Sequence, residues 1–285
     1  MGKWKDLMIQ GMEIKGLAES TIYNYTLEMR KLIKHYKKDP SKLKLEDLIL
    51  YQHFLVKNNV SKCRFKMSVA SMRYFYKHTC PMEWDIESVH YQKEAKRLPV
   101  VFSKDEIQRI LSNTIFLKHR IIILFAYSAG LRMSEVLNLK VADIDSDRML
   151  IHVHLGKGLK DRYTPLSPRL LEYLREYYKQ DRHLIKDYLF PGRNGRMERT
   201  GSRKSFKKCL KRAGITKYGT FHTLRHSFAT HLLEDGINLL VVQKLLGHCS
   251  IKTTMIYLHV ATNYIVSSHS PLDTLYFPTK KQDDR

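Results

Sequence analysis

The stretch TFHTLRHSFATHLLEDG, residues 220–236, places His222, Arg225, His226 and His231 on one expected helix. His222 and Arg225 are three positions apart, so they share a face near the helix N-terminus. The unpaired backbone N–H groups and the positive dipole at such an end favour an anion. Zinc binding, core packing and phosphate chemistry all use these residue types, and the rest of the sequence distinguishes among them.

The spacing of the histidines gives little support to a zinc site. His222 and His226 are four residues apart, but no Glu follows His222 as the HExxH pattern requires, and a third ligand is not obvious. The pair His226 and His231 has no third ligand either. We therefore assign no metal to this stretch, and we expect His226 and His231 to bond to backbone carbonyls in a core.

Three other stretches favour phosphate chemistry. AGLRMSEV contains Arg132 just after a glycine and Glu135 three residues later, and LGKGLKDR contains Lys157 between two glycines. KLLGHCSIKTTMIYLH contains His248 at a helix end marked by glycine and Tyr257 nine residues later. Each residue has an ordinary alternative, such as a surface ion pair for Arg132 or a core position for Tyr257. Together with the first stretch they supply two guanidiniums, an amine, two imidazoles and a phenol.

This set of groups can transfer a phosphodiester to a phenol without a metal. The pentavalent transition state gathers negative charge, which fixed guanidinium groups stabilise. A phenol with a pKa of about 10 needs charge neutralisation or a base, and the leaving alkoxide needs a proton donor. Because the covalent phosphotyrosyl bond keeps the energy of the broken bond, we expect no nucleotide or other cofactor.

Four segments, in this order and spacing, resemble the tyrosine recombinase/integrase family: AYSAGLRMSEVLNL, HLGKGLKDRYTPL, HTLRHSFATHLLEDG and VVQKLLGHCSIKTTMIYLHV. The resemblance covers most of residues 100–260, is weaker over the N-terminal part, and is nearest to compact Xer-like and mobile-element integrases. It implies that Tyr257 attacks phosphorus and becomes linked to a DNA 3′-phosphate. It also implies that Arg132 and Arg225 clamp the scissile phosphate and that His248 adds a hydrogen bond to it.

The same resemblance assigns the proton transfers. His222 helps to take the Tyr257 proton, Lys157 protonates the departing 5′-oxygen, and Glu135 orients the site. Lys160, in the same turn as Lys157, is expected to be a phosphate contact or a solvated charge.

The charge of the chain indicates a nucleic-acid partner. Its 50 Lys and Arg against 28 Asp and Glu give a net charge of +22, accompanied by 17 Tyr and 11 Phe. Such an excess repels itself unless a polyanion shares the load. Hydrophobic residues make up 43% of the chain, which excludes a disordered protein. Arg30, Lys31 and Lys34 lie on a basic N-terminal helix and are expected to contact DNA.

The cysteines and the apolar runs indicate a cytoplasmic protein. Cys63, Cys80, Cys209 and Cys249 match no CxxC pattern, and no secretory signal precedes them. We expect reduced thiols and a cytoplasmic location. The longest apolar run, IIILFAY (121–127), is too short to cross a membrane and predicts a buried helix.

The expected fold is mainly α with a small antiparallel β-sheet. Apolar residues at alternating steps of three and four predict helices over 20–38, 44–58 and 62–78, the first capped by Ser20 or Thr21. Four parts are expected: an all-helical core-binding domain (1–86), a linker (87–102), a mixed α/β catalytic domain of the tyrosine recombinase type (103–275) and a polar tail (276–285).

The catalytic domain is expected to open with a capping box at Ser103 and Glu106. A buried helix then ends at Gly130, and two short strands over 149–167 form a hairpin. Further helices are expected over 168–180, 203–213, 222–235, 238–246 and 250–259.

The expected function is site-specific recombination of double-stranded DNA by a homotetramer on two paired duplexes. The segment around residues 265–275 is expected to dock on a neighbouring subunit. Two other functions remain open: a type IB topoisomerase-like enzyme that relaxes DNA with the same chemistry, and a non-catalytic DNA-binding factor. Covalent trapping on nicked DNA separates the enzymes from a binding protein. The target site, and the choice between chromosome-dimer resolution and mobile-element integration, stay open.

Overall fold

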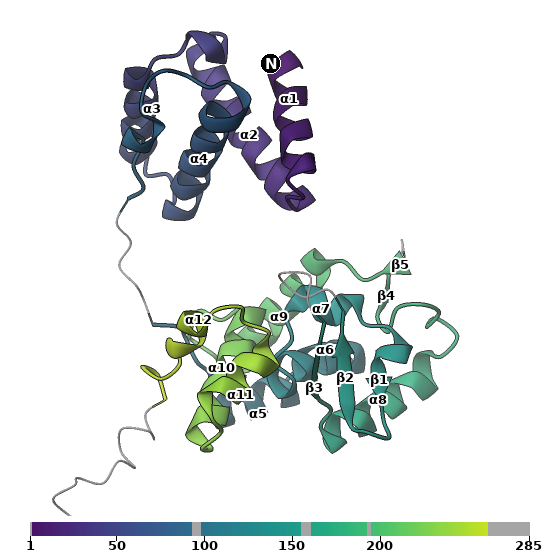
Figure 1. The fold of residues 1–285 in the computed structure, drawn as a ribbon. Helices are drawn as coiled ribbons and strands as arrows, with labels where there is room; N and C mark the ends of the chain where they lie inside the picture. The colour runs from purple at the N-terminus through teal and green to yellow at the C-terminus, as the bar shows by residue number, and fades with distance from the viewer. Residues whose placement is uncertain (1, 93–97, 155–160, 193–194, 262–285) are drawn as a thin grey trace, which may run out of the picture. The chain divides into compact units, whose positions relative to one another are not determined.

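The computed structural model describes residues 2–92, 98–154, 161–192 and 195–261, and the chain divides into two compact units, Met1–Lys96 and Arg97–Arg285 (Figure 1). This division falls within the expected linker, residues 87–102. The expected tail, residues 276–285, lies outside the described residues. The described part of both units is rich in helix, and its strands are short and antiparallel. The expected mainly α fold with a small antiparallel sheet is therefore confirmed.

The first unit is a bundle in which α2 packs against α1 and α4. Met29 and Leu32 of α2 are fully buried, and Ser71 Oγ of α4 donates a 2.6 Å hydrogen bond to the Tyr25 carbonyl. The elements are α1 (Gly2–Ile14), α2 (Glu19–Tyr36), η1 (Pro40–Lys42), α3 (Leu45–Lys57), α4 (Lys62–Tyr74), the π-helical turn η2 (Phe75–Thr79) and η3 (Ile86–Ser88).

The start of α2 differs from the predicted N-cap. The helix begins at Glu19, Ala18 is its N-cap, and no side chain caps it, so Ser20 and Thr21 fall in the first turn. Gly16, in the left-handed region at φ +64°, ends the preceding turn. Leu17, the next residue, packs against the core. The turn at Gly16 and the packing of Leu17 place the start of α2 at Glu19, one residue before Ser20.

The second unit begins with the capping box predicted at Ser103 and Glu106, which is confirmed. Its helices are α5 (Lys104–Ser112), α6 (Leu117–Ser128), α7 (Met133–Asn138), η4 (Val141–Asp143), α8 (Pro168–Asp181), α9 (Arg199–Arg212), α10 (Phe221–Glu234), α11 (Leu239–Leu246) and α12 (Ile251–Met255). Its strands are β1 (Ile144–Asp145), β2 (Leu150–Val153), β3 (Arg162–Pro165), β4 (Pro191–Gly192) and β5 (Gly195–Arg196).

Helix α6 lies at the centre of the second unit, and α8 and α10 pack against it. Its residues Ile121, Ile122, Ile123 and Phe125 are almost fully buried, which confirms that IIILFAY is a core helix. Among the described residues, none of the helices has the length and apolar character required to span a membrane.

The predicted hairpin is confirmed, and a third strand extends it. β2 pairs antiparallel with β3 and with β1, in the order β1-β2-β3. Ile151 and Val153 of β2 are buried, whereas His152, between them, pairs with the exposed Tyr163 of β3 on the outer face. The sheet thus has an apolar inner face and a polar outer face. β4 and β5 form a separate two-stranded ribbon.

Two glycines allow chain segments to approach closely around α10 and α11. Gly130 has φ +63°, and a Cβ there would lie 2.5 Å from the Phe228 ring. Gly247 has φ +62° as the C-cap of α11, and its Cβ would lie 2.9 Å from Arg162 Cδ. Both positions need left-handed geometry and the absence of a side chain.

The last helix is shorter than predicted. α12 ends at Met255, whereas the sequence predicted a helix over 250–259. The Tyr257 N–H donates to the Thr254 carbonyl, and the Leu258 N–H donates to the Met255 carbonyl. These i to i−3 bonds tighten the chain into turns, so Tyr257 lies just beyond regular α-helix.

Candidate active site

Five of the six side chains expected to react lie in the described residues, on elements that meet around α10. Arg132 precedes α7, His222 and Arg225 lie in the first half of α10, and His248 and Tyr257 flank α12. Burial has the largest effect on the pKa values of these groups: it lowers those of His222 and His248 and raises that of Tyr257. The charge of Arg225 has the next largest effect on all three, and on Tyr257 it opposes the effect of burial. Lys157, like Lys160, lies outside the described residues.

Glu135 connects two arginines at this site. Its carboxylate accepts hydrogen bonds from the Arg132 backbone N–H at 2.8 Å and from Arg132 Nη1 at 2.6 Å. Arg162 Nη2 and Nη1 donate to its two oxygens at 2.7 and 3.1 Å. Burial alone raises the pKa of Glu135, but Arg162 and Arg132 outweigh this effect and hold it at about 2. The carboxylate is therefore charged and fixes both guanidiniums.

Arg162 is a residue of this site that the sequence analysis did not select. Besides its paired bonds to Glu135, its Nε donates to the Leu245 carbonyl at 2.9 Å, and its side chain covers Gly247. A signal was present in the sequence, because the alternation along β3 places Arg162 on the same face as the buried Thr164. A charged residue on the inner face of a strand requires a partner.

Arg225 is fully buried, with an exposed fraction of 0%. Its Nη1 donates to the Gly130 carbonyl at 2.6 Å and its Nη2 to the Leu246 carbonyl at 2.5 Å, while Nη1 lies 3.8 Å from Glu135. Its Nε has no partner in the structure. Burial, and then the charge of Arg132, lower its pKa to about 9, so the guanidinium stays charged at neutral pH. The backbone carbonyls of Gly130 and Leu246 therefore fix the buried cation, and its Nε is left without a partner.

The Tyr257 side chain is 1% exposed, and its hydroxyl lies 2.9 Å from His226 Nδ1. Burial raises the pKa of Tyr257, whereas the charges of Arg225 and Arg132 lower it. Burial also lowers the pKa of His226 to about 4, so this imidazole is neutral at pH 7. A neutral ring protonated on Nε2 accepts the phenolic hydrogen bond at Nδ1.

The partners of His226 and His231 correct the sequence-based expectation in part. His226 bonds to the Tyr257 hydroxyl instead of a backbone carbonyl, because the turn after α12 brings the phenol against α10. His231 Nδ1 lies 2.9 Å from the Tyr127 hydroxyl, and the ring also bonds to the Phe102 backbone. His231 therefore has the predicted core role.

His248 and His222 are the other two imidazoles of the site. His248 Nδ1 lies 2.9 Å from Thr254 Oγ1, and its ring is nearly parallel to the Tyr257 ring at a centroid distance of 6.4 Å. Burial, followed by the charges of Arg225 and Arg132, lowers the pKa of His248 to about 3. His222 is exposed, and its ring lies 4.6 Å from the His226 ring. Its pKa is lowered by desolvation and then by Arg225.

Basic side chains also cover surfaces outside this site. Arg30 and Lys34 of α2 are exposed, whereas Lys31 is half-buried and bonds to the buried Glu28 at 2.5 Å. Helix α9 carries a row of exposed cations that the sequence analysis did not single out: Arg203, Lys204, Lys207, Lys208, Lys211 and Arg212. The opposite side of α9 is buried at Phe206 and Leu210, so the cations face solvent.

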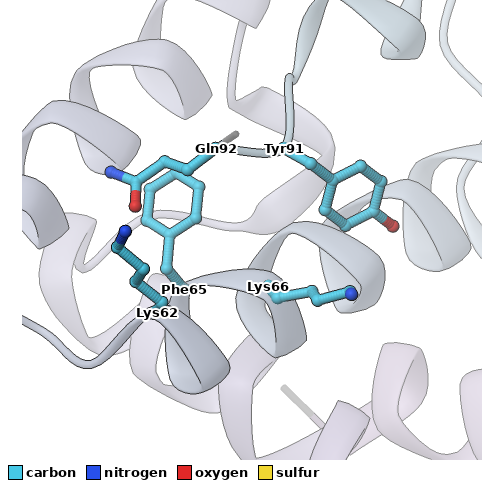
Figure 2. A pocket seen from close by; sticks show the side chains of 5 residues that line it. All are labelled: Lys62, Phe65, Lys66, Tyr91 and Gln92. Atoms are coloured by element: carbon cyan, nitrogen blue, oxygen red, sulfur yellow. The ribbon is translucent and has the colours of Figure 1, made fainter. Parts of the chain in front are cut away.

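The first unit contains a cavity of about 330 Å³ lined by Lys62, Phe65, Lys66, Tyr91 and Gln92 (Figure 2). Lys62 and Lys66 extend in opposite directions from α4, with Phe65 between them (Figure 2). Two ammonium groups beside two aromatic rings form a surface of the kind that contacts phosphates and sugars.

Comparison with known proteins finds matches to both parts of the chain. The model of the Phage integrase family matches residues 101–263, and that of the phage integrase N-terminal SAM-like domain matches residues 4–86. The protein described as "Putative integrase/recombinase y4qK" of Sinorhizobium fredii is 38% identical over 275 residues, 95% of this chain and 89% of the relative. Tyrosine recombinase XerD of Listeria innocua is 33% identical over 267 residues, covering 86% of this chain and 90% of the relative.

Solved structures share the fold. The crystal structure of XerA recombinase is 27% identical with a TM-score of 0.56, over 95% of this chain and 99% of the other. XerH recombinase, in a post-cleavage complex with its palindromic difH substrate, is 23% identical with a TM-score of 0.72, over 88% and 80%. Since the family model matches more than half of the chain and relatives above 30% identity span most of it, this chain belongs to the phage integrase family and is a tyrosine recombinase.

Proposed function

We propose that this protein recombines double-stranded DNA at specific sites, with Tyr257 as the nucleophile. The phenolic oxygen forms a bond to phosphorus, the bond from phosphorus to the 5′-oxygen breaks, and the DNA 3′-phosphate remains on Tyr257. A 5′-hydroxyl of the partner strand then reverses the attack and releases the enzyme. The observation that carries the proposal is the buried Tyr257 phenol, whose hydroxyl lies 2.9 Å from His226 on the same helix as Arg225.

The charge of the site suits a phosphodiester. Arg132, Arg162 and Arg225 provide three positive charges and Glu135 one negative charge, which leaves an excess of two positive charges. A phosphodiester carries one negative charge, and its pentavalent transition state carries about two. In our proposal Arg132 and Arg225 hold the non-bridging oxygens, while Glu135 keeps Arg132 in position and Arg162 fixes Glu135.

The imidazoles have separate tasks in this proposal. We assign the Thr254 hydroxyl as the donor in its 2.9 Å hydrogen bond with His248 Nδ1. The proton of the neutral ring then lies on Nε2, which donates to a phosphate oxygen. His226 holds the phenol before DNA binds. When Tyr257 turns to the phosphate, His222 receives its proton. Lys157 gives a proton to the departing 5′-oxygen, a role that rests on the family resemblance.

The DNA-binding surface in this proposal includes the exposed cations of α9, the α2 residues Arg30 and Lys34, and the cavity between Lys62 and Lys66. Each unit would contact DNA through one of these basic surfaces. Since the substrate is genomic or mobile DNA, we propose that the protein acts in the cytoplasm.

A homotetramer on two paired duplexes follows from the chemistry. Recombination requires four strand cuts, and each chain supplies one Tyr257. Helices α11 and α12 expose three apolar side chains, Leu240, Val241 and Met255, at 64%, 47% and 45%. Such a surface suits a contact between neighbouring subunits. The segment expected to dock on a neighbouring subunit, around residues 265–275, lies outside the described residues.

A selection from nicked duplexes of randomised sequence tests this function. We expect SDS-resistant DNA adducts whose sequencing yields a preferred site, and a plasmid with two copies of that site should then be resolved into two circles. The Tyr257→Phe variant should bind the site within a few-fold of the unmodified protein and form no adduct. Relaxation of supercoiled DNA without strand exchange would instead indicate a topoisomerase-like enzyme. DNA binding by the unmodified protein without any adduct would indicate a non-catalytic DNA-binding factor.

A further inference from the structure

Two histidines and two aspartates meet on the outer face of the three-stranded sheet, apart from the recombination site. His152 and His154 belong to β2 and the turn after it, Asp143 ends η4, and Asp161 directly precedes β3. His152 Nε2 lies 3.1 Å and His154 Nδ1 3.6 Å from Asp161 Oδ2. His154 Nε2 lies 2.7 Å from Asp143 Oδ1.

Two of the separations between these atoms are close to those between neighbouring metal ligands. Zinc binds imidazole nitrogen and carboxylate oxygen at about 2.0–2.2 Å in a tetrahedron, which places neighbouring ligand atoms about 3.3–3.6 Å apart. His152 Nε2 and His154 Nδ1 lie at 3.1 and 3.6 Å from the same Asp161 oxygen. With small movements of the side chains, a cation could therefore lie between Asp161 Oδ2 and the two imidazole nitrogens, in place of the proton that His152 and Asp161 share.

The surrounding groups already fix the orientation of both imidazoles. Asp143 is 5% exposed, and its second oxygen accepts a 2.8 Å hydrogen bond from the Lys140 backbone N–H. Its first oxygen faces His154 Nε2, which leaves His154 Nδ1 directed at Asp161. The His152 ring stacks on Tyr163, at 4.7 Å between centroids and 16° between planes. A carboxylate that orients a metal-binding histidine from behind is a recurring feature of metal sites.

We propose that His152, His154 and Asp161 bind one divalent transition-metal ion such as Zn²⁺, with Asp143 as the positioning residue of His154. Within the described part of the chain, the possible ligand side chains whose atoms all lie within 4.8 Å of one another are Asp143, His152 and His154. Asp161 is not in that group, and we assign it as a ligand because its Oδ2 lies near one nitrogen of each imidazole. Nitrogen and carboxylate ligands of this kind suit Zn²⁺, Ni²⁺ and Co²⁺ better than Mg²⁺.

The position of the site suggests a structural task. The β2–β3 ladder ends with the pair Val153 and Arg162, so His154 and Asp161 stand at the next position on each strand. An ion bound there joins the two strands where their backbone pairing stops. The ion takes no part in strand transfer, because the chemistry inferred for the active site requires no metal.

Isothermal titration calorimetry tests this proposal. The untagged full-length chain is treated with a chelator, desalted and titrated with ZnCl₂. We expect one Zn²⁺ per chain with micromolar or tighter affinity. The His152→Ala/His154→Ala variant should lose that binding, and Asp143→Asn should weaken it by about 10–100-fold. A matched variant at two exposed histidines elsewhere, His53→Ala/His183→Ala, should bind as the unmodified chain does.

Two further measurements separate metal binding from a folding defect. Circular dichroism melting without metal should show a cooperative transition for every variant, although removing a partner of the buried Asp143 carboxylate lowers the midpoint. Co²⁺ should give a visible absorption band in the unmodified chain and in the His53→Ala/His183→Ala control, and none in His152→Ala/His154→Ala. The proposal is wrong if the unmodified chain takes up no stoichiometric metal, or if His152→Ala/His154→Ala binds Zn²⁺ equally well.

Discussion

The hydroxyl of Tyr257 is buried and hydrogen-bonded to His226, whereas attack on phosphorus requires the same oxygen to face DNA and to lose its proton. His226 is neutral because burial holds its pKa at about 4, so it can accept the phenolic hydrogen bond. We interpret this arrangement as a resting state in which His226 holds the nucleophile. Binding of DNA would supply the phosphate that competes for Tyr257 near Arg132 and Arg225.

A double-mutant cycle measures the contact between His226 and Tyr257. Leaving a buried hydroxyl without a partner costs about 1–3 kcal/mol, so His226→Phe should lower the free energy of unfolding by that amount. In the Tyr257→Phe background the same substitution should cost less, because the hydroxyl is already absent. Urea denaturation of the four proteins gives the coupling energy, and strictly additive effects would show that the hydrogen bond contributes nothing.

The two buried imidazoles also predict acid sensitivity. The folded chain lowers the pKa of His226 to about 4 and of His248 to about 3, from an ordinary value of about 6.5. The unfolded chain therefore binds more protons between these values, so stability is complete above about pH 6.5 and is lost as the pH falls. The loss should reach at most about 1.4 kcal/mol per pH unit for each histidine.

Urea denaturation between pH 7 and about pH 4.5 checks this dependence. The His226→Gln/His248→Gln variant should lose less stability over this range than the unmodified protein. A matched change at the exposed His183, His183→Gln, should leave the slope unchanged. Identical slopes in all three proteins would assign the acid sensitivity to other groups.

At the residue scale, the sequence selected candidate reactive groups, which stay predictions, but it did not contain all of their contacts. Arg132, Arg225, His248 and Tyr257 stood in segments whose spacing was recognisable. The partner of His226 depends on how the turn after α12 folds back on α10, a long-range contact that helical periodicity does not contain. Arg162 was missed because a charged residue next to a Lys-rich turn has an ordinary solvated alternative.

Three element junctions carry the site: the α6–α7 turn, the N-terminal half of α10 and the α11–α12 turn. Two of these helix ends were predictable, since Gly130 follows α6 and Gly247 caps the end of α11. The third strand, β1, has only two residues, and so short a segment leaves no detectable alternation in the sequence. The end of α12 depends on tertiary packing around Tyr257 and was predicted too late.

Gly247→Ala should damage the site through its element junction. An alanine there adds strain at φ +62° and places its Cβ 2.9 Å from Arg162 Cδ, so Arg162 must move away from Glu135. We expect a lower melting temperature and slower covalent adduct formation at saturating DNA. The Gly236→Ala control has φ +84° but open space around its Cβ. It should lower stability and spare the adduct rate, and equal rate losses in both variants would argue against the Arg162 explanation.

On the scale of the whole molecule, the +22 charge and the exposed cations of α9 indicate extensive phosphate contacts. The composition alone predicted a nucleic-acid partner. The division into Met1–Lys96 and Arg97–Arg285 resembles the two-domain organisation that the sequence suggested. The sequence did not predict that the row of cations on α9 would be one solvent-exposed face. That depends on which side of the helix the core buries.

DNA affinity should therefore depend steeply on salt. About 6–10 phosphate contacts would reduce affinity by roughly 10³–10⁵ between about 50 and 200 mM salt. Lys207→Ala/Lys208→Ala should lower the slope of log affinity against log salt by about two. Lys104→Ala, at an exposed lysine already paired with Asp235 at 2.9 Å, should leave the slope unchanged. Fluorescence anisotropy measures each slope, and a flat response would mean that the charge serves another purpose.

The identity of the nucleophile is measured most directly by mass spectrometry of the covalent adduct. The full-length protein is trapped on a nicked duplex, digested with trypsin and nuclease, and searched for peptides that carry a nucleotide 3′-phosphate. We predict that the modified peptide contains Tyr257 and that the phosphate is attached to its phenolic oxygen. A nucleotide attached to any other residue, with Tyr257 unmodified, would contradict the assignment of Tyr257 as the residue that cuts DNA.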